Sequence, residues 1–338
     1  MSNQPHIAAR VYRGREIEAI HYASIAVVDC DGRLTHSLGD PELVTMMRSA
    51  IKPFQLLPLI TTGAADHFGF DDQQLAIMCG SHNGSDEHRE VVLSNLAAAG
   101  NEPSHLQCGC HWPLGMQERL QFPLAGEEFD PVRHNCSGKH SGFLALARYL
   151  NEPVLDYLHI EGKVQQLVKA AVSQMCDFPA DRMTPGIDGC SAPNYPLSVR
   201  SLATGFMRLA NLQGQDRIPV SALTRVRQAM YAFPEMVSGK GRFDLALARS
   251  LPDNVVCKIG AEAVEGIGLA DPPLGIAVKI HDGNWRCLGA VVIEVLKQLS
   301  ILSIEKAPLL KRLEKPDVRN VRGTITGHIV PEFELRKH

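Results

Sequence analysis

Two kinds of hydrophobic pattern alternate along the chain, one typical of strands and one typical of helices. Residues 23–29 (ASIAVVD) and 33–38 have strand character, and Asp31-Gly32 between them predicts a tight β-hairpin turn. A second hairpin is predicted around Asp282-Gly283, which has strand-like residues on both sides. The later segments with strand character are 254–259, 274–281 and 285–288.

Apolar residues recur at helical spacing in much of the remaining chain. Pro53 falls in the first turn of one such segment, where proline is tolerated, and Pro58 predicts a kink within it. Asp71 comes directly before another segment, as helix-capping residues do. The predicted helices are residues 49–61, 72–79, 86–98, 139–150, 161–176, 198–211 and 289–302.

The order of these elements favours one continuous fold across residues 1–338. Strands and helices interleave from start to end without an internal repeat or a low-complexity linker. Sequential hairpins indicate an antiparallel sheet, and amphipathic helices must cover its faces to bury their apolar residues. We therefore expect a single domain of the α/β (α+β) class, with an antiparallel sheet covered by helices.

Composition narrows the range of partners. Hydrophobic residues make up 45% of the 338-residue chain, which is ordinary for a globular protein with a core. The chain has 34 Lys and Arg against 37 Asp and Glu, a net charge of −3, so charge gives no reason to expect nucleic acid or an anionic membrane as a partner. This balance suits a small polar substrate held in a pocket.

We expect neither a targeting segment nor a membrane span. The first residues, MSNQPHIAAR, lack the apolar stretch of a signal peptide. The most apolar late segment, 288–304, contains Glu294 and Lys297 and is typical of an amphipathic core helix. The nine scattered cysteines, an odd number, argue against a disulfide framework and for a reducing, cytoplasmic location.

Three short motifs carry candidate chemistry. In Ser49-Ala50-Ile51-Lys52, at a predicted helix start, residues three apart share a helix face, so the hydroxyl and the amine can meet. A neutral lysine can then remove the serine proton, and free N–H groups at the helix N-terminus can hold an oxyanion. The other motifs are Ser81-His82-Asn83, in an interhelical loop, and Lys258-Ile259-Gly260, at a strand end.

Each motif alone is weak evidence. The S-x-x-K pattern occurs again at Ser303–Lys306, where nothing else supports catalysis, and a capping serine beside a solvated lysine explains any single match. Order and context raise their value: a hairpin, S-x-x-K opening a helix, S-x-N between helices, then K-x-G on a late strand. This is the layout of serine β-lactamases and penicillin-binding proteins, and it indicates acyl transfer from a carbonyl that carries a nitrogen leaving group.

Cysteine and lysine gather in polar, glycine-containing segments. Cys136 lies at a predicted helix start, where the helix dipole lowers the pKa of a thiol, and Cys190 lies in the loop 184–196. Two thiolates suit zinc. A third candidate group, whose role the sequence leaves open, is Cys108, Cys110 and His111. The cysteines expected to be buried, inert thiols are Cys30, Cys79, Cys176, Cys257 and Cys287.

Longer segments carry a more specific signal. They are RSAIKPFQLLPL, CGSHNGSDEH, HNCSGKHSGFL, GIDGCSAPNYPLS, FPEMVSGKGRFD and KIGAEAVEGIGL. Together they resemble the asparaginase II family, the thermolabile L-asparaginases of the Rhizobium etli type, over nearly the whole chain. The resemblance implies a β-lactamase/glutaminase-like fold, a homodimer, and hydrolysis of L-asparagine to L-aspartate and ammonia.

The same resemblance implies roles for individual residues. Two Ser-Lys tandems map onto Ser49 with Lys52 and onto Ser81 with Lys258. The family's zinc site, one per chain, maps onto Cys136, Lys139 and Cys190, with Asp188 as the carboxylate that orients the lysine ligand. One departure from the family pattern is Ala263, which stands where glycine is expected. Its extra methyl group can tighten the pocket or reduce activity.

The expected mechanism proceeds through an acyl-enzyme. Ser49 attacks the side-chain carbonyl of asparagine while Lys52, kept neutral by burial and neighbouring cations, removes its proton. Ser81 and Lys258 relay a proton to the leaving nitrogen, although two Ser-Lys pairs leave the identity of the nucleophile open. The residues expected to bind the substrate are Arg48, Asn83 and Arg242, the two arginines through its α-carboxylate.

Two alternatives stay open at this point. A penicillin-binding-type serine peptidase or esterase would contain the same tripeptides but would not need Cys136, Lys139 and Cys190. A catalytically inactive zinc-binding or amino-acid-sensing module would keep that cluster without turnover. Zinc itself is expected to position the substrate, because a lysine ligand must first lose its proton.

Overall fold

The computed structural model describes residues 5–118, 121, 126, 129–214, 218–251 and 255–338. Among them, nine strands form one sheet in the order β11-β12-β1-β2-β10-β9-β8, with β3 beside β2 and β13 beside β3. Every neighbouring pair is antiparallel, as predicted. The strands are β1 His6–Arg13, β2 Glu16–Val28, β3 Leu34–Leu38, β8 Val256–Gly260, β9 Val264–Ala270, β10 Pro273–Ile280, β11 Asp317–Arg319, β12 Ile325–Pro331 and β13 Arg336–Lys337.

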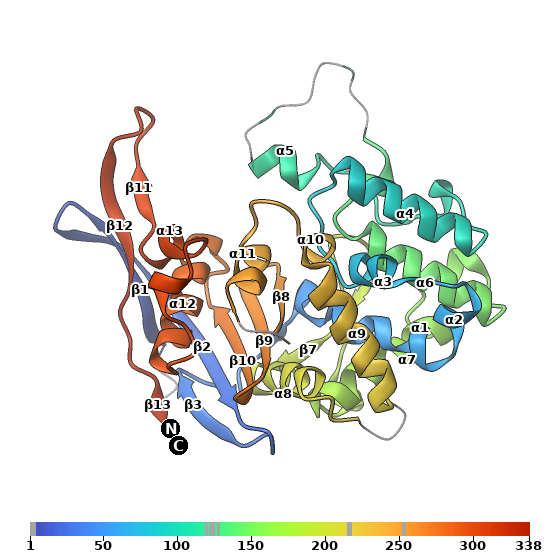
Figure 1. Cartoon of the computed structure of the whole chain (residues 1–338), viewed down its shortest axis with the longest axis horizontal. Helices are drawn as coiled ribbons and strands as arrows, with labels where there is room; N and C mark the ends of the chain where they lie inside the picture. The colour runs from blue at the N-terminus through green and yellow to red at the C-terminus, as the bar shows by residue number, and fades with distance from the viewer. Residues whose placement is uncertain (1–4, 119–120, 122–125, 127–128, 215–217, 252–254) are drawn as a thin grey trace.

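Helices cover both faces of this sheet (Figure 1). On one face α8 (Val199–Ala210) lies across β2, β9 and β10, and it comes so close that a Cβ on Gly275 would sit 2.0 Å from the carbonyl oxygen of Ala203. On the other face the apolar side of the sheet packs against helices from the last third of the chain. These are α11 Phe243–Ser250, α12 Leu288–Gln298 and α13 Lys311–Glu314. The predicted α/β architecture, a sheet covered by helices, is confirmed.

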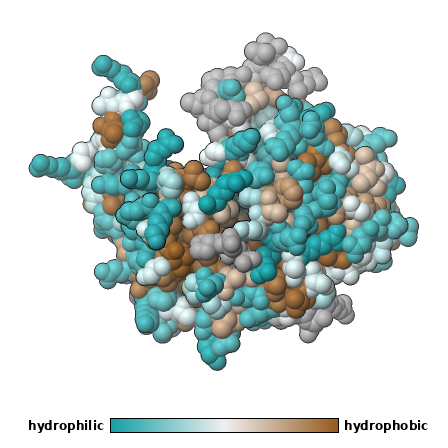
Figure 2. Space-filling view, in the orientation of Figure 1, coloured by the Kyte–Doolittle hydropathy of each residue, from teal (hydrophilic) through white to brown (hydrophobic). Residues whose placement is uncertain are grey.

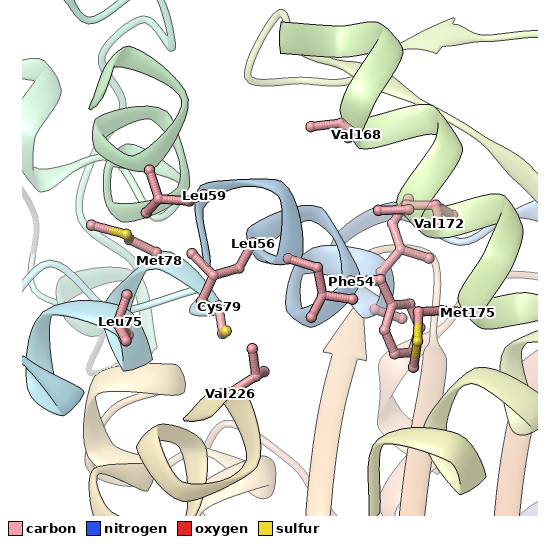
Figure 3. Close-up of a cluster of buried hydrophobic side chains, with 14 of the residues drawn as sticks. Phe54, Leu56, Leu59, Leu75, Met78, Cys79, Val168, Val172, Met175 and Val226 are labelled. Atoms are coloured by element: carbon pink, nitrogen blue, oxygen red, sulfur yellow. The ribbon is translucent and has the colours of Figure 1, made fainter. Parts of the chain in front are cut away.

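The remaining helices form a second layer built around α1 (Lys52–Thr61). Its side chains reach in several directions: Figure 3 shows Phe54 directed toward Val172 and Met175 of α7, and Leu59 near Met78 at the end of α3. This packing keeps the whole first turn of α1 away from solvent. The surrounding helices are α2 Ala64–His67, α3 Asp72–Met78, α4 Asp86–Ala98, α5 Leu114–Glu118, α6 Ser137–Tyr149, α7 Lys163–Cys176, α9 Val220–Ala232 and α10 Pro234–Val237.

Short elements connect the two layers. Two small antiparallel pairs lie outside the main sheet. Strand β4 (Val44–Met46) pairs with β7 (Pro196–Ser198), which joins segments far apart in the chain. Strand β5 (Gly186–Ile187) pairs with β6 (Pro193–Asn194), which closes a local turn. The single-turn 3₁₀ helices are η1 Arg48–Ile51, η2 Pro103–His105, η3 Pro131–Arg133, η4 Val154–Asp156, η5 Ala180–Arg182, η6 Trp285–Cys287 and η7 Ile304–Lys306.

Several predicted elements form where the pattern placed them. The first hairpin pairs β2 with β3, and Gly32 in its turn has the left-handed φ of 73° that such a turn requires. Asp71 caps α3 through its side chain, and the predicted helix 86–98 is α4. The predicted helix 49–61 begins instead as the 3₁₀ turn η1, because Arg48 has a left-handed φ of 52°, and becomes α-helical only at Lys52.

The second predicted hairpin is wrong. Strand β10 pairs with β9 and β2, and residues 285–287 form the helix η6, capped by the Asn284 side chain, which accepts a hydrogen bond from the backbone of Arg286. The partner strand β9 was missed because its sequence, VEGIGLA, contains two glycines and a glutamate, which weaken a strand signal. Glycine is needed there, since the Phe206 ring would lie 2.1 Å from a Cβ on Gly266.

One face of the molecule is mainly polar. The face seen in Figure 2 is mostly hydrophilic, with smaller hydrophobic areas between the sheet and the helices. In the described part of the chain, none of the helices has the length and apolar character needed to cross a bilayer.

Replacing Gly275 with alanine tests the close packing of α8 on the sheet. The added methyl group would meet the Ala203 carbonyl at 2.0 Å, so helix and strand must separate. We expect a loss of about 1–3 kcal/mol in the free energy of unfolding, measured by urea denaturation. The control is Glu16→Ala, an exposed change expected to alter stability by less than about 0.5 kcal/mol. Equal stability of the two variants would contradict this account of the packing.

Candidate active site

The three motifs predicted to be catalytic meet where the sheet edge touches the start of α1. Ser49 lies in η1 and is 9% exposed, Lys52 is the first residue of α1, and Ser81 lies in the loop between α3 and α4. Strand β8, which carries Lys258, packs directly on η1: a Cβ on Gly260 would lie 2.4 Å from the Met47 carbonyl oxygen. Elements far apart in the sequence thus bring two serines and two buried lysines together.

The Lys52 amine connects the first two motifs. Its Nζ donates to the carbonyl oxygen of Gly80 at 2.5 Å, to Ser81 Oγ at 3.0 Å and to Cys136 Sγ at 3.2 Å. The side chain is 1% exposed, so these three acceptors replace water around the amine. Within the described residues no hydrogen bond joins Lys52 to Ser49, although the S-x-x-K spacing predicts that contact. The amine is instead directed to the loop after α3.

Lys258 has a different environment. Its Nζ donates to the Ile259 carbonyl oxygen at 2.6 Å and lies 3.6 Å from Asp244 Oδ2 on α11. Burial lowers the pKa of Lys258 to about 8, with Asp244 opposing the shift and the charge of Lys52 adding to it. Among the described residues no hydrogen bond links Lys258 to Ser81. The geometry therefore pairs Ser81 with Lys52, and the two tandems assigned from the family resemblance stay predictions.

Arg48, expected to bind the substrate carboxylate, is held by Asp188. Its guanidinium contacts Asp188 Oδ1 through two nitrogens, at 2.8 and 2.7 Å, and its backbone N–H donates to the Asn194 side chain at 3.0 Å. These residues line an open pocket of about 520 Å³ beside η1. The other residues that line it are Thr45, Met46, Gly186, Ile187, Glu262, Lys279 and His281.

The other two predicted substrate ligands are Asn83 and Arg242, neither of which lines the pocket beside η1. Asn83 is buried under Gly239, where a Cβ would lie 2.5 Å from the amide carbon, and its Oδ1 has no hydrogen-bond partner in the described part of the chain. Arg242 precedes α11, and its charge lowers the pKa of Lys258. Asn83 therefore offers a free acceptor, while Arg242 acts electrostatically on Lys258.

The predicted zinc ligands come together in one buried cluster. Cys136 caps α6, Lys139 lies one turn into that helix, and Lys139 Nζ contacts Cys190 Sγ at 3.1 Å. The two thiols are hydrogen-bonded to each other, and all three side chains are at most 5% exposed. Two sulfur donors with an amine fit zinc chemically. Among the described residues, His, Cys, Asp and Glu alone provide no group of three that could hold a metal, so the Lys139 amine would have to be the third ligand.

Charge is unevenly shared in this cluster. The hydrogen bond that Cys136 donates to Cys190, together with burial, raises the pKa of Cys136. The same hydrogen bond and the charge of Lys139 lower the pKa of Cys190. Burial disfavours the Lys139 ammonium, but the negative charge of Cys190 outweighs it and raises the pKa of Lys139. The expected lowering at Cys136 by the helix dipole is therefore wrong, because its partner thiol carries the charge.

The remaining cysteines divide into buried and exposed side chains. Cys108 is buried and donates to the Pro131 carbonyl, Cys110 is exposed, and His111 Nε2 lies 3.0 Å from the Asn135 side chain. Four of the cysteines expected to be inert are buried, namely Cys79, Cys176, Cys257 and Cys287. Cys30 is exposed, contrary to expectation, because it lies beside the solvent-facing turn of the first hairpin.

Sequence reasoning missed the acidic residues behind Lys258. Asp244 and Glu265 are 2% and 0% exposed, and both affect the pKa of that lysine. A signal was present at Glu265, since a carboxyl group within an otherwise apolar strand is unusual unless it has a partner. Asp244 gave no such signal because α11 looks like an ordinary short helix.

Some solved structures are similar to this chain in outline. The first is described as Mglu in its native form, with 16% identity, a TM-score of 0.46, and coverage of 83% of this chain but only 65% of that longer one. The Bacillus subtilis glutaminase YbgJ, solved in a covalent complex with 5-oxo-L-norleucine, has 16% identity, a TM-score of 0.39 and coverage of 82% and 87%. A β-lactamase of Mycobacterium bovis, Mb2281c, has 13% identity, a TM-score of 0.40 and coverage of 83% and 95%. No curated protein matches the sequence.

The comparison with family models gives a match over nearly the whole chain. The model described as L-asparaginase II matches residues 9–331. That range includes every predicted catalytic and zinc-binding residue, from Arg48 to Lys258. This protein therefore belongs to the L-asparaginase II family.

Proposed function

We propose that this protein hydrolyses L-asparagine to L-aspartate and ammonia. The observation that carries the proposal is the Lys52 amine, buried and hydrogen-bonded to Ser81 Oγ, with Ser49 three residues before it and Lys258 on the strand packed against η1. Membership of the L-asparaginase II family supports the choice of substrate. A hydroxyl beside a buried amine is the arrangement that activates serine for attack on an amide.

In this mechanism Ser49 Oγ attacks the side-chain carbonyl carbon of asparagine. Lys52 takes up the serine proton, and the backbone N–H of Ser49 stabilises the oxyanion. The carbon–nitrogen bond breaks as the nitrogen receives a proton through Ser81 and Lys258, and ammonia leaves. Water then hydrolyses the β-aspartyl ester and restores Ser49. Ser81 is the second candidate nucleophile, because its hydroxyl is the one already bonded to Lys52.

The pocket beside η1 suits the zwitterionic end of an amino acid. Lys279 and Arg48 provide positive charge for an α-carboxylate, and Glu262 provides a carboxylate for an α-ammonium group. Arg48 Nη1 lies 3.9 Å from Glu262 Oε1, so the two charges are already neighbours. Asp188 holds the guanidinium in place, which limits the entropy lost when substrate binds.

Zinc would be held by Cys136, Lys139 and Cys190. Bound there, it would supply a positive charge close to the substrate. The chain's own residues support this location, since Lys52 bonds to Cys136 and so links the cluster to Ser81. Asp188 lies near enough to stabilise positive charge on Lys139 and also binds Arg48, which couples the cluster to the substrate pocket. Assembly as a homodimer is proposed on the family resemblance, and a cytoplasmic location on the nine scattered cysteines. Light scattering after gel filtration tests the first.

Replacing each serine with alanine identifies the nucleophile. We expect Ser49→Ala to lower kcat by several orders of magnitude, and Ser81→Ala to lower it on the order of a hundredfold. Ammonia release from asparagine is the measurement. Ser303→Ala, in the exposed second S-x-x-K sequence, is the matched control and should be unaffected. Near-normal turnover by folded Ser49→Ala would transfer the nucleophile to Ser81.

The pH dependence tests whether Lys258 must be neutral for part of the cycle, so that it can accept and pass on the proton that it relays. A lysine accepts a proton only when neutral, and burial lowers the pKa of Lys258 to about 8. We therefore expect kcat/KM to rise about tenfold per pH unit below that value and to level off above it. Lys306→Met, at an exposed lysine, should keep this profile. A profile that is flat or falling between pH 7 and 9 would argue against a lysine base.

Elemental analysis tests the zinc site. We expect about one zinc per chain in the wild type and none in Cys136→Ala or Cys190→Ala, because two thiolates dominate zinc affinity. Cys30→Ala, at an exposed cysteine away from the cluster, should retain the metal. Chelation should raise KM more than it lowers kcat, since the proposed role is positioning. Full activity of metal-free wild type would remove zinc from the mechanism.

A further inference from the structure

The loop that carries Ser81 is attached to two helices, α10 and α6. The Ser81 backbone N–H donates to the Val237 carbonyl oxygen of α10 at 2.8 Å. His82 Nε2 lies 2.9 Å from the Oγ of Ser137, the first residue of α6. In the described part of the chain, no other member of residues 80–85 hydrogen-bonds to α6. The attachment of this loop to α6 therefore depends on one histidine side chain, which the proposed mechanism does not use.

The hydrogen-bond partners of His82 determine which of its ring nitrogens carries the proton. Ser137 Oγ donates its only proton to the Val132 carbonyl oxygen at 2.6 Å, because a carbonyl can only accept. The same Oγ must then accept from His82, so Nε2 is protonated. His82 Nδ1 has no hydrogen-bond partner within the described residues, and the side chain is 0% exposed, so a second proton there would be unsatisfied. Burial also lowers the pKa of His82 well below its ordinary value, and the ring is therefore neutral.

A second buried histidine limits the rotation of the His82 ring. The ring of His88, on α4, stacks on it with centroids 5.0 Å apart and planes at 23°. His88 Nε2 donates to the Glu235 carbonyl oxygen at 2.9 Å, and its Nδ1 accepts from the Ser85 hydroxyl at 2.7 Å. The ring that stacks on His82 is thus held at both of its nitrogens.

The contact between His82 and Ser137 lies next to the contacts of the Lys52 amine. His82 directly follows Ser81, whose Oγ accepts from Lys52 Nζ at 3.0 Å. Ser137 directly follows Cys136, whose Sγ accepts from the same amine at 3.2 Å. A displacement of the loop away from α6 would therefore change the distance between the Ser81 hydroxyl and Lys52.

We propose that His82 is a positioning residue for Ser81: its Nε2–H donates to Ser137 Oγ and so holds the Ser81 hydroxyl at hydrogen-bond distance from Lys52. The inference deepens the proposed amidohydrolase function and rests on it for the role of Ser81 in proton transfer. Because the His82 side chain is fully buried, a substrate does not touch it, and the histidine acts only through the loop.

Two amide substitutions at His82 separate hydrogen bonding from packing. The side-chain nitrogen of glutamine reaches about as far as Nε2 of histidine and can donate to Ser137, whereas that of asparagine ends near the position of Nδ1 and cannot reach it. We expect His82→Asn to lower kcat for ammonia release from asparagine about a hundredfold with little change in KM, and His82→Gln to stay within about threefold of the wild type. His159→Asn, at an exposed histidine, is the control and should be unaffected.

A double mutant tests whether the effect passes through Ser81. If His82 only positions that hydroxyl, its substitution cannot matter once the hydroxyl is gone. In the Ser81→Ala background we therefore expect His82→Asn to lower kcat further by less than about threefold. A further loss of about a hundredfold would show that His82 acts elsewhere and would overturn the proposal. Equal losses in His82→Asn and His82→Gln, or normal turnover by His82→Asn, would overturn it as well.

Nuclear magnetic resonance gives two readouts that need no turnover. In wild-type protein labelled with ¹⁵N at histidine, the His82 signals, assigned by their loss in His82→Gln, should show a protonated Nε2 and an unprotonated Nδ1 at neutral pH. The opposite tautomer rejects the hydrogen bond, whether or not His82→Asn folds. With ¹³C at lysine Cε, the Lys52 signal, assigned by its loss in Lys52→Met, should shift in His82→Asn and stay in place in His82→Gln.

These readouts keep this inference apart from the proposed function. The expected tautomer and a shifted Lys52 signal without ammonia release from asparagine would keep the His82 assignment and reject the proposed function. Normal asparaginase activity of the wild type with an unshifted Lys52 signal in His82→Asn would do the reverse.

Discussion

The burial of the Lys52 amine at the start of α1 is the constraint on which the active region depends. Lys52 is surrounded by helices, so its Nζ must find oxygen and sulfur acceptors inside the protein. Those acceptors come from the loop after α3 and from the cap of α6, at Gly80, Ser81 and Cys136. The hydrogen bonds of this one amine therefore hold two loops and the thiol cluster in place near Ser49. Breaking these contacts would leave a buried polar group without a hydrogen-bond partner, which is costly.

At the sheet edge, a second buried lysine amine has different partners. Lys258 is as buried as Lys52, but it lies beside the acidic pair Asp244 and Glu265 and bonds to a strand carbonyl. The two lysines repel each other, and burial disfavours the charge on Lys258, so this amine is the one prepared to be neutral near pH 8. Lys52 thus also holds the site together through its hydrogen bonds, and both lysines transfer protons in the proposed mechanism.

The thiol cluster extends this network toward the substrate pocket. Cys136 contacts Lys52, Cys190 contacts Lys139, and Asp188 stabilises positive charge on Lys139 while binding Arg48 at the pocket wall. A charge change at any one of these positions is felt by the others, because little water intervenes to screen it. Zinc binding, substrate binding and serine activation are therefore expected to be coupled in this protein.

Local patterns determined the elements whose residues depend only on their neighbours. The hairpin turn at Asp31-Gly32, the cap at Asp71 and helix 86–98 were predictable, as was the family, from long segments around Cys136 and Cys190. Only the tertiary structure decided that β9 is a strand, that Lys52 bonds to Ser81, and that Lys258 lies beside Asp244. These features arise from contacts between residues far apart in the chain, and the direction of a buried polar group is set by whichever acceptor the fold brings to it.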